Sequence, residues 1–199
     1  MTVRRLSALA IGVFLVSALA WLVVIPRLQP HTFNGVVMQS LTEAPAIDLR
    51  STSGELVSLD SFKGKLVVVY FGYTHCPDVC PTTLSTLNRA LDRMGDRSDD
   101  VQVVMVTVDP ERDTVDLLAE YMSYFNETFI GLTGSVEDVA KVATTYGVYF
   151  AANDGDADSG YTVDHTAHLM VIDRAGHLRL VLPPELGPEE IASDLEYLS

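Results

Sequence analysis

Residues 66–84 read LVVVYFGYTHCPDVCPTTL, and this stretch decides the fold. Its first part, residues 66–73, is a continuous run of apolar, β-branched and aromatic residues, typical of a central strand buried on both faces. The run leads directly into two cysteines. Beyond them Leu84, Leu87 and Leu91 recur at helical spacing. The stretch therefore predicts a buried strand, a cysteine loop and an amphipathic helix, in that order.

The sequence on either side alternates between strand and helix patterns. The expected elements are two short strands around a Ser53-Gly54 turn, a strand over 101–109, a helix from the cap Thr114 to about Asn126, a short strand over 129–133, a helix capped by Ser135, a flexible polar loop over 151–160, a hairpin over 168–182 and a helix opened by Pro188. Together with the cysteine motif at a strand-to-helix junction, this order predicts an α/β domain of thioredoxin-like fold. Its central mixed sheet would be flanked by helices.

An apolar segment precedes this domain. Residues 6–25 carry no charge and would span roughly 30 Å as a helix, the thickness of a bilayer core. Arg4 and Arg5 before the segment predict a cytoplasmic N-terminus and an exported domain. We expect a single-pass protein of the cell membrane with a periplasmic domain, divided into an anchor (1–27), a linker (28–43) and the folded domain (44–199).

The alternative for this segment is a cleaved signal peptide, because Ala18-Leu19-Ala20 resembles a cleavage site. Cleavage there would leave an apolar stub on the mature chain, which favours an uncleaved anchor. Beyond Arg27 the chain has ten basic and 27 acidic residues, a net charge of −17 with histidine neutral. This charge argues against nucleic acid or anionic lipid headgroups as partners.

Cys76 and Cys80 are the only cysteines. A disulfide between them would close a very short loop and add little stability, which favours a chemical role. At the start of a helix, with Asp78 as a candidate N-cap, backbone N–H groups and the helix dipole favour a thiolate, which is both a nucleophile and a soft metal ligand. Three intervening residues relax the pair toward spanning a metal, although local bending would still permit a disulfide.

Among five histidines, His165 is the best candidate for a third ligand, because it lies just before the late hairpin that returns beside the cysteine loop. Two thiolates and an imidazole suit copper, as Cu(I) or Cu(II), whereas zinc usually takes a fourth ligand. The alternative is an ordinary hydrogen-bonded histidine. Asp109, at the end of a central strand, is a candidate for a supporting or docking role, and Asp164 is a candidate to orient the imidazole.

Three stretches, GYTHCPDVCPTTL (72–84), VTVDPERDT (106–114) and YTVDHT (161–166), resemble the Sco/SenC family of copper-binding, thioredoxin-like proteins. The resemblance covers about residues 44–198. It implies that Cys76, Cys80 and His165 are the copper ligands. It also implies a role in assembling the binuclear copper centre of cytochrome c oxidase subunit II, which would be the partner together with a periplasmic copper donor.

Two functions are expected on this basis. The first is a copper metallochaperone, which is not an enzyme. The second is a thiol-disulfide reductase that keeps the client's cysteines reduced, in which Cys76 and Cys80 would be catalytic. A copper-responsive sensor is a third option. Loss of the His165 imidazole would impair the metallochaperone and leave the reductase active.

Overall fold

The structure is a computed structural model that describes residues 11–15, 17–21, 31–39, 42–153 and 160–199. The chain divides into two units, Met1–Thr32 and Phe33–Ser199. In the first unit residues 11–15 and 17–21 are helical. The rest of the expected membrane span lies outside the described residues. Within the described part of the chain, no helix combines the length and the apolar character needed to cross a membrane.

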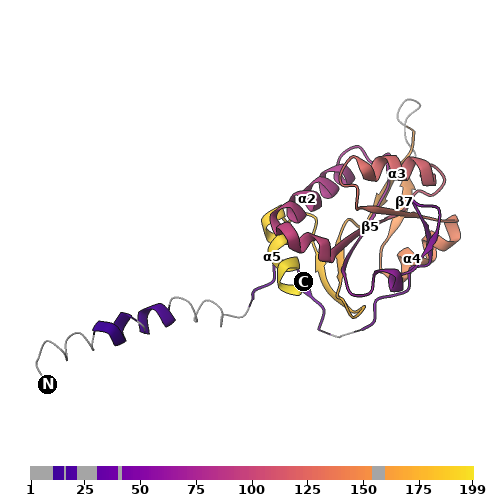
Figure 1. Ribbon diagram of the computed structural model, residues 1–199. Coiled ribbons are helices and arrows are strands. Elements are labelled where there is room, and N and C mark those ends of the chain that lie inside the picture. Colours follow the sequence, from indigo (N-terminus) through magenta and orange to yellow (C-terminus); the bar gives the residue numbers. More distant parts are fainter. Residues whose placement is uncertain (1–10, 16, 22–30, 40–41, 154–159) are drawn as a thin grey trace, which may run out of the picture. The chain divides into compact units, whose positions relative to one another are not determined.

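The second unit is built on an eight-stranded mixed sheet (Figure 1). At its centre β4 (Leu66–Gly72) pairs in parallel with β5 (Val101–Thr107) on one side and antiparallel with β9 (Leu169–Ile172) on the other. Every residue of β4 and β5 is buried. The expectation of a central strand covered on both faces is therefore confirmed.

The outer strands complete the sheet in the order β1-β10-β9-β4-β5-β6-β2-β3. Their bounds are β1 (Val36–Val37), β10 (Leu178–Leu182), β6 (Ile130–Thr133), β2 (Leu49–Ser51) and β3 (Leu56–Val57). The predicted turn between β2 and β3 is present, with Gly54 at a φ of 84° that favours glycine. The predicted late hairpin is the antiparallel pair β9–β10.

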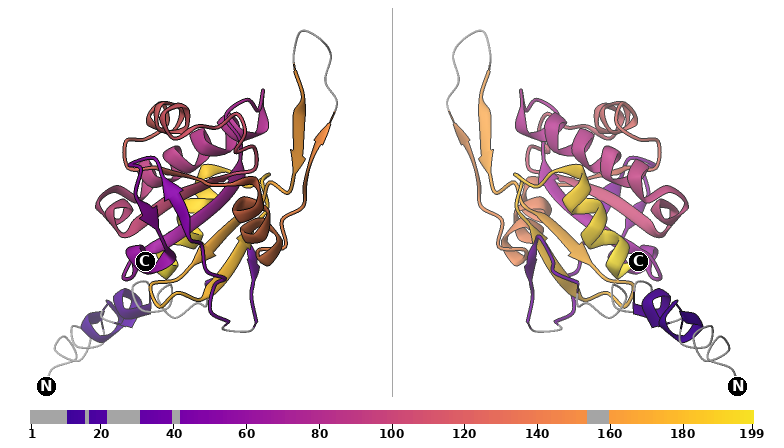
Figure 2. Two further views of the ribbon diagram at one scale, coloured as in Figure 1. Left: turned by 90° about the vertical axis from the view of Figure 1, so that its right-hand side faces the viewer. Right: turned by 90° about the vertical axis from the view of Figure 1, so that its left-hand side faces the viewer.

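Helices cover both faces of this sheet. The α-helices are α2 (Val79–Met94), α3 (Val115–Ser123), α4 (Val136–Thr145) and α5 (Pro188–Leu198), and 3-10 turns span Leu59–Phe62 and Gly95–Asp100. α2 and α5 pack together on one face, and α4 lies on the other (Figures 1 and 2). The predicted caps are confirmed, since Thr114 and Ser135 accept from backbone N–H groups of their helices. Residues 124–126 were expected to be helical, but α3 ends at Ser123.

Two features differ from the expectation. β7 (Phe150–Asn153) and β8 (Thr162–His165) form a separate antiparallel ribbon that extends away from the main sheet (Figure 2). The flexible loop expected over 151–160 is therefore wrong for residues 151–153, and residues 154–159 lie outside the described part. A ribbon with little buried surface leaves no alternating pattern in the sequence, so β7 could not be recognised.

The second difference is at the start of the domain. β1 lies within the expected linker and pairs with β10, so the folded unit begins at Phe33 and not at residue 44. A strand of two exposed residues is too short to produce a recognisable periodicity.

Candidate functional site

The two cysteines lie where β4 gives way to α2, as the sequence predicts. Cys76 is half-buried in the connecting loop, and Cys80 is fully buried in the first turn of α2. Both are free thiols. The backbone N–H of Cys80 donates to Cys76 Sγ at 3.4 Å, so this sulfur satisfies one of the free donors at the helix start. Asp78 occupies the N-cap position, but its carboxylate accepts from the Thr82 hydroxyl and not from the helix backbone.

The surroundings separate the acidities of the two thiols. The adjacent Cys80 thiol lowers the pKa of Cys76 well below its usual range, with further support from His165 and from the backbone N–H groups of Cys80 and Asp78. The thiolate of Cys76 and burial together raise the pKa of Cys80. Cys76 is therefore the reactive thiolate at neutral pH, and Cys80 holds its proton.

His165, the last residue of β8, brings its imidazole to Cys80. Its Nε2 lies 3.5 Å from Cys80 Sγ, and its Nδ1 lies 3.2 Å from the carbonyl oxygen of Thr166. A carbonyl oxygen can only accept, so Nδ1 carries a proton, and Nε2 is the ring nitrogen that faces the sulfur. The Thr166 carbonyl thus provides the orientation for which Asp164, an exposed residue, was a candidate.

The ring of His165 is enclosed by aromatic side chains. Tyr70 and Tyr73 both meet it edge to face, with centroid distances of 6.1 and 6.0 Å. The Tyr73 hydroxyl also accepts from the backbone N–H of Val163, which ties β8 to the segment that carries the cysteines. The imidazole is therefore packed against two aromatic rings.

Asp109 supports β8 from the end of β5. It is buried, pairs with the guanidinium of Arg112 and accepts from the Tyr161 hydroxyl at 2.7 Å. Arg112 in turn donates to the Tyr161 carbonyl oxygen at 2.9 Å. Tyr161 immediately precedes β8, so this cluster fixes the start of the strand that ends at His165. The position expected for Asp109, beside the cysteine loop, agrees with this arrangement.

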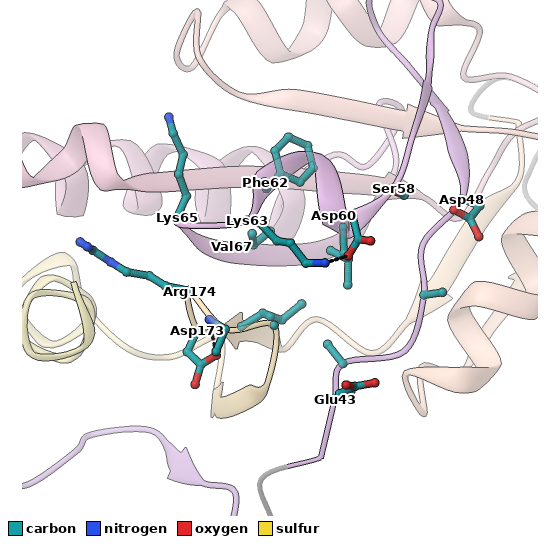
Figure 3. Close-up of a pocket in the computed structure, with 16 residues that line it drawn as sticks. Glu43, Asp48, Ser58, Asp60, Phe62, Lys63, Lys65, Val67, Asp173 and Arg174 are labelled. Atoms are coloured by element: carbon teal, nitrogen blue, oxygen red, sulfur yellow. Dashed lines mark hydrogen bonds and ion pairs between the residues drawn. The ribbon is translucent and has the colours of Figure 1, made fainter.

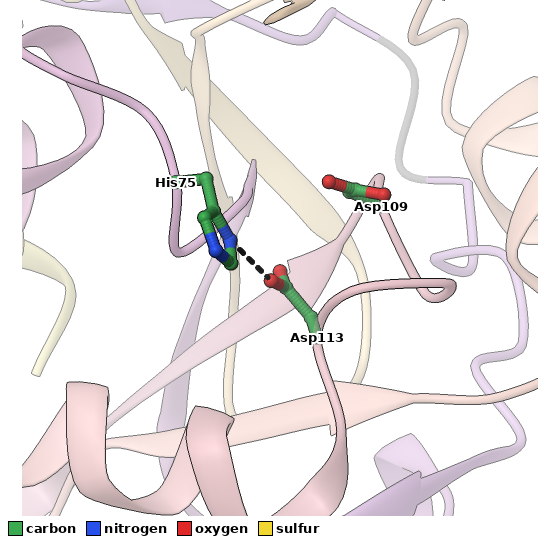
Figure 4. A group of neighbouring side chains, drawn as sticks. All are labelled: His75, Asp109 and Asp113. Atoms are coloured by element: carbon green, nitrogen blue, oxygen red, sulfur yellow. Dashed lines mark ion pairs between the residues drawn. The ribbon is translucent and has the colours of Figure 1, made fainter. Parts of the chain in front are cut away.

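Asp113 ties the cysteine loop to the end of β5. Its fully buried carboxylate accepts from the Thr74 hydroxyl at 2.6 Å, from the Thr74 backbone N–H at 3.1 Å and from the Thr107 hydroxyl at 2.5 Å. His75 lies beside this carboxylate, with Nδ1 3.8 Å from Oδ1 (Figure 4). The segment just before Cys76 is therefore anchored at several points.

His75, Asp109 and Asp113 each offer a ligand atom within 4.8 Å of the others (Figure 4). Both carboxylates already accept hydrogen bonds from protein donors, which tie the cysteine loop and β8 to the end of β5. By the same measure, Cys76, Cys80 and His165 are spread more widely. A single ion bound by them would draw the three donor atoms together.

Sequence reasoning missed three residues that build this site: Tyr70, Arg112 and Asp113. Tyr70 reads as one more apolar residue of a buried strand. Asp113 reads as a turn residue before the cap Thr114. The available signal for Asp113 was that Asp113 and Thr114 are both residues of the capping type, although a helix needs only one N-cap. Of the other described histidines, His177 lies in the β9–β10 turn, where Nδ1 is 3.4 Å from Asp173.

A hollow of about 490 Å³ lies elsewhere, at the opposite end of β4 (Figure 3). Its wall includes Lys63, which pairs with Asp60 at 3.0 Å, and Arg174, which pairs with Asp100 at 2.7 Å. Basic and acidic side chains thus neutralise one another around it. The thiols and the imidazole are not part of its lining.

Known proteins are similar to this chain in sequence and fold. The SCO2-like protein of Rickettsia felis is 35% identical over 150 residues, which cover 75% of this chain and 73% of that protein. The structure of Bradyrhizobium japonicum ScoI with copper bound is 39% identical with a TM-score of 0.72, covering 79% of this chain and 100% of that one. Arabidopsis thaliana ScoI with copper bound is 33% identical with a TM-score of 0.74, covering 78% and 97%.

The sequence profile of the SCO1/SenC family matches residues 39–199, which include both cysteines, the Asp109–Asp113 segment and His165. The mixed α/β fold with its flanked central sheet agrees with the solved structures of that family. From the profile, the relatives and the fold together, it follows that this chain belongs to the SCO1/SenC family.

Proposed function

We propose that this chain is a copper carrier that binds one ion through Cys76, Cys80 and His165 and delivers it to the binuclear centre of cytochrome c oxidase subunit II. One observation carries the proposal: Nε2 of His165 faces Cys80 Sγ at 3.5 Å. Copper is bound in the structures of two similar proteins, from Bradyrhizobium japonicum and Arabidopsis thaliana. The client is the one that the family resemblance implies.

The donor set fits copper. Two thiolates suit Cu(I), and the imidazole also accepts Cu(II). Zinc usually takes a fourth ligand. In the described part of the chain, the nearby carboxylates of Asp109 and Asp113 are engaged with protein donors, which disfavours a fourth ligand from either.

The unequal burial of the ligands suits transfer. Cys76 is half-buried while Cys80 is enclosed, so a client thiolate can approach the ion from the Cys76 side. Cys80 and His165 would retain the ion until the client sulfur has joined it. The protein's own contribution is to orient the imidazole through its Nδ1 atom and to hold the Cys76 sulfur as a thiolate.

The test is an anaerobic Cu(I) titration of the reduced chain, comparing wild type, His165→Ala and the control His177→Ala. His177 is a histidine of the β9–β10 turn and lies outside the site. Wild type and His177→Ala should each bind one copper, and His165→Ala should bind at least about tenfold more weakly, since it lacks one ligand. Equal affinity of all three chains would contradict the assignment of His165.

A second function is favoured by the separated acidities of the two thiols. As a reductase, the Cys76 thiolate would attack a client disulfide, form a mixed disulfide and release one client thiolate. Cys80 would then lose its proton and attack Cys76, which releases the second client thiolate and leaves a Cys76–Cys80 disulfide. An external dithiol would reduce that disulfide and restore the pair.

The two functions separate on metal and on His165. A reductase retains activity in His165→Ala and in the presence of a copper chelator. A carrier loses client maturation in both cases when copper is limiting. The measurement is the reduced-thiol content of the client beside its copper content.

We also propose that residues 1–27 anchor the chain in the cell membrane with the folded unit on the periplasmic side. The uncharged run 6–25 and the preceding Arg4 and Arg5 support this arrangement. Deletion of residues 1–27 behind a cleavable export signal should move the protein from the carbonate-washed membrane to the soluble periplasmic fraction. A mature wild-type protein that begins at Trp21 would instead establish signal-peptide cleavage.

A further inference from the structure

Tyr70 has a buried hydroxyl group that is not used by the fold. The residue is fully buried in the middle of the sheet, on β4. Its oxygen lies near the side chains of Cys80 and Thr83, which both influence its pKa, but it has no partner at hydrogen-bond distance among the residues that the structure describes. Buried polar groups nearly always have a partner, and an unsatisfied one costs free energy. A hydroxyl retained at this position therefore calls for a reason beyond the metal-free fold.

The Tyr70 ring lies beside Cys80 and His165 of the candidate site. A Cβ atom placed on Gly72 would come within 3.3 Å of Tyr70 Cζ and within 3.1 Å of Cys80 Sγ. Tyr70 Cζ, which bears the hydroxyl, and Cys80 Sγ therefore both lie close to the position of that Cβ atom. Because Gly72 has no side chain, this position is open. The Tyr70 ring also meets the His165 ring edge to face.

Tyr70 retains its proton in this setting. Burial raises the pKa of the phenol far above its ordinary value. The hydroxyl is therefore a donor at any physiological pH. In the metal-free chain Cys80 Sγ already contacts His165 Nε2 at 3.5 Å. A thiol sulfur without a metal is a weak hydrogen-bond acceptor, so the Tyr70 hydroxyl gains little from it.

We propose that the Tyr70 hydroxyl donates a hydrogen bond to the Cys80 thiolate in the copper-loaded protein. Tyr70 is then a positioning residue, and its hydrogen bond favours Cu(I) over Cu(II). This inference rests on the proposed copper-carrier function. On loading, Cys80 releases its thiol proton to solvent, and the sulfur becomes a charged acceptor beside a donor that retains its own proton. A hydrogen bond to a copper-bound thiolate changes the Cu(II)/Cu(I) reduction potential. The donor withdraws electron density from the sulfur, which raises this potential and favours Cu(I).

The test compares Tyr70→Phe with Tyr146→Phe in the full chain. Tyr146 is a matched control, because it is also buried and its hydroxyl donates to the Pro45 carbonyl oxygen at 2.7 Å, a bond of the fold. In the metal-free form, Tyr70→Phe should be at least as stable as wild type in urea unfolding, since it removes an unsatisfied group. Tyr146→Phe should be less stable.

In the copper-loaded form the order reverses. Tyr70→Phe should bind Cu(I) about tenfold more weakly, because a hydrogen bond to a charged group is lost. Its Cu(II)/Cu(I) potential should fall and its thiolate-to-Cu(II) charge-transfer band should move. Tyr146→Phe should match wild type in affinity, potential and spectrum.

Three outcomes would overturn the inference. A wild-type chain that binds no copper removes the proposed function, and it is detected before any variant is compared. If wild type binds copper and Tyr70→Phe has the same affinity, potential and spectrum, the role of Tyr70 is rejected while the copper-carrier function stands. A metal-free Tyr70→Phe variant that is less stable than wild type shows that the hydroxyl already has a partner in the fold.

Discussion

The guanidinium carbon of Arg112 lies 3.6 Å from the centre of the Tyr161 ring, and the same guanidinium group donates to the Tyr161 carbonyl oxygen. This pair connects the end of β5 to the residue before β8. Since β8 ends at His165, the position of the imidazole depends on a contact formed at the other end of its strand.

Tyr161→Ala should therefore weaken copper binding without touching a ligand. Loss of the ring removes a cation–π contact of about 0.5–2 kcal/mol and loosens the start of β8. If the fraction of chains with His165 in place falls, the apparent affinity falls by the same factor, roughly several-fold. The control is Tyr149→Ala, whose exposed side chain lies just before β7. Equal affinities of these two variants in Cu(I) competition with a chelator would rule out a role for the Arg112–Tyr161 contact.

Asp113→Asn should destabilise the fold and disturb the cysteine loop. The buried carboxylate accepts three hydrogen bonds from Thr74 and Thr107, and an amide replaces one acceptor oxygen with a donor group. We expect a loss of about 1–3 kcal/mol in the free energy of unfolding, measured in urea. The rate at which Cys76 is alkylated should change as well.

Asp116→Asn is the matched control for that variant, since Asp116 is an exposed residue in the first turn of α3. Its effect should be limited to a few tenths of a kcal/mol from the helix dipole. A stability loss of similar size in both variants would mean that the Asp113 hydrogen bonds contribute nothing specific to the loop.

Gly72→Ala should be destabilising because the new methyl group has no space. It would meet Tyr70 Cε1 at 2.7 Å and Cys80 Sγ at 3.1 Å. Overpacking of this kind costs about 1–3 kcal/mol, measured by urea unfolding. Gly187→Ala, where the nearest atom is the end of the flexible Glu190 side chain at 3.4 Å, should cost far less. A fully stable Gly72→Ala chain would show that β4 and α2 can separate at this point.

The reactivity of Cys76 should persist in mildly acidic solution. Its pKa is lowered, chiefly by the Cys80 thiol, so the thiolate fraction and the alkylation rate stay on a plateau as the pH falls from about 8 to about 6. An ordinary thiol with a pKa of about 8.5 would lose most of its rate over that range. The measurement is the rate of iodoacetamide labelling, resolved by peptide mass spectrometry.

Cys80→Ser provides the comparison for that profile. Replacing the thiol alters the main cause of the shift, so the pKa of Cys76 should rise and the labelling rate at about pH 6 should fall. Cys80 itself should remain unlabelled in the folded wild type, since its pKa is raised and its side chain is buried. Equal labelling of both cysteines would contradict the separation of their acidities.

The central part of the fold could be predicted because its signals are local. The run at residues 66–72 is apolar on both faces, and Thr114 and Ser135 cap helices through bonds within one turn. The cysteines were placed correctly for the same reason, since a strand followed by a helix puts them at the helix start. That His165 comes beside Cys80 followed from the expected fold.

The supporting residues could not be predicted because their roles arise from tertiary contacts. Asp113 reaches Thr74 across 39 residues, and Arg112 reaches Tyr161 across 49. The orientation of His165 depends on the carbonyl of Thr166, which every residue type possesses and no sequence pattern reveals. Tyr70 is indistinguishable in sequence from an ordinary core residue.

The pairing of β7 with β8 has a consequence for how quickly the ion could leave. β4, which delivers the cysteines, is bonded along both edges, whereas β8 belongs to a ribbon of only two strands. Such a ribbon is marginally stable alone, and it can open locally at lower free energy than the whole domain. The imidazole of His165 is thus carried by the ribbon, which opens more easily, and the two cysteines follow the central strand β4, which opens less easily. The residence time of the bound copper ion would then depend on local opening of the β7–β8 ribbon and not on the melting temperature of the whole domain.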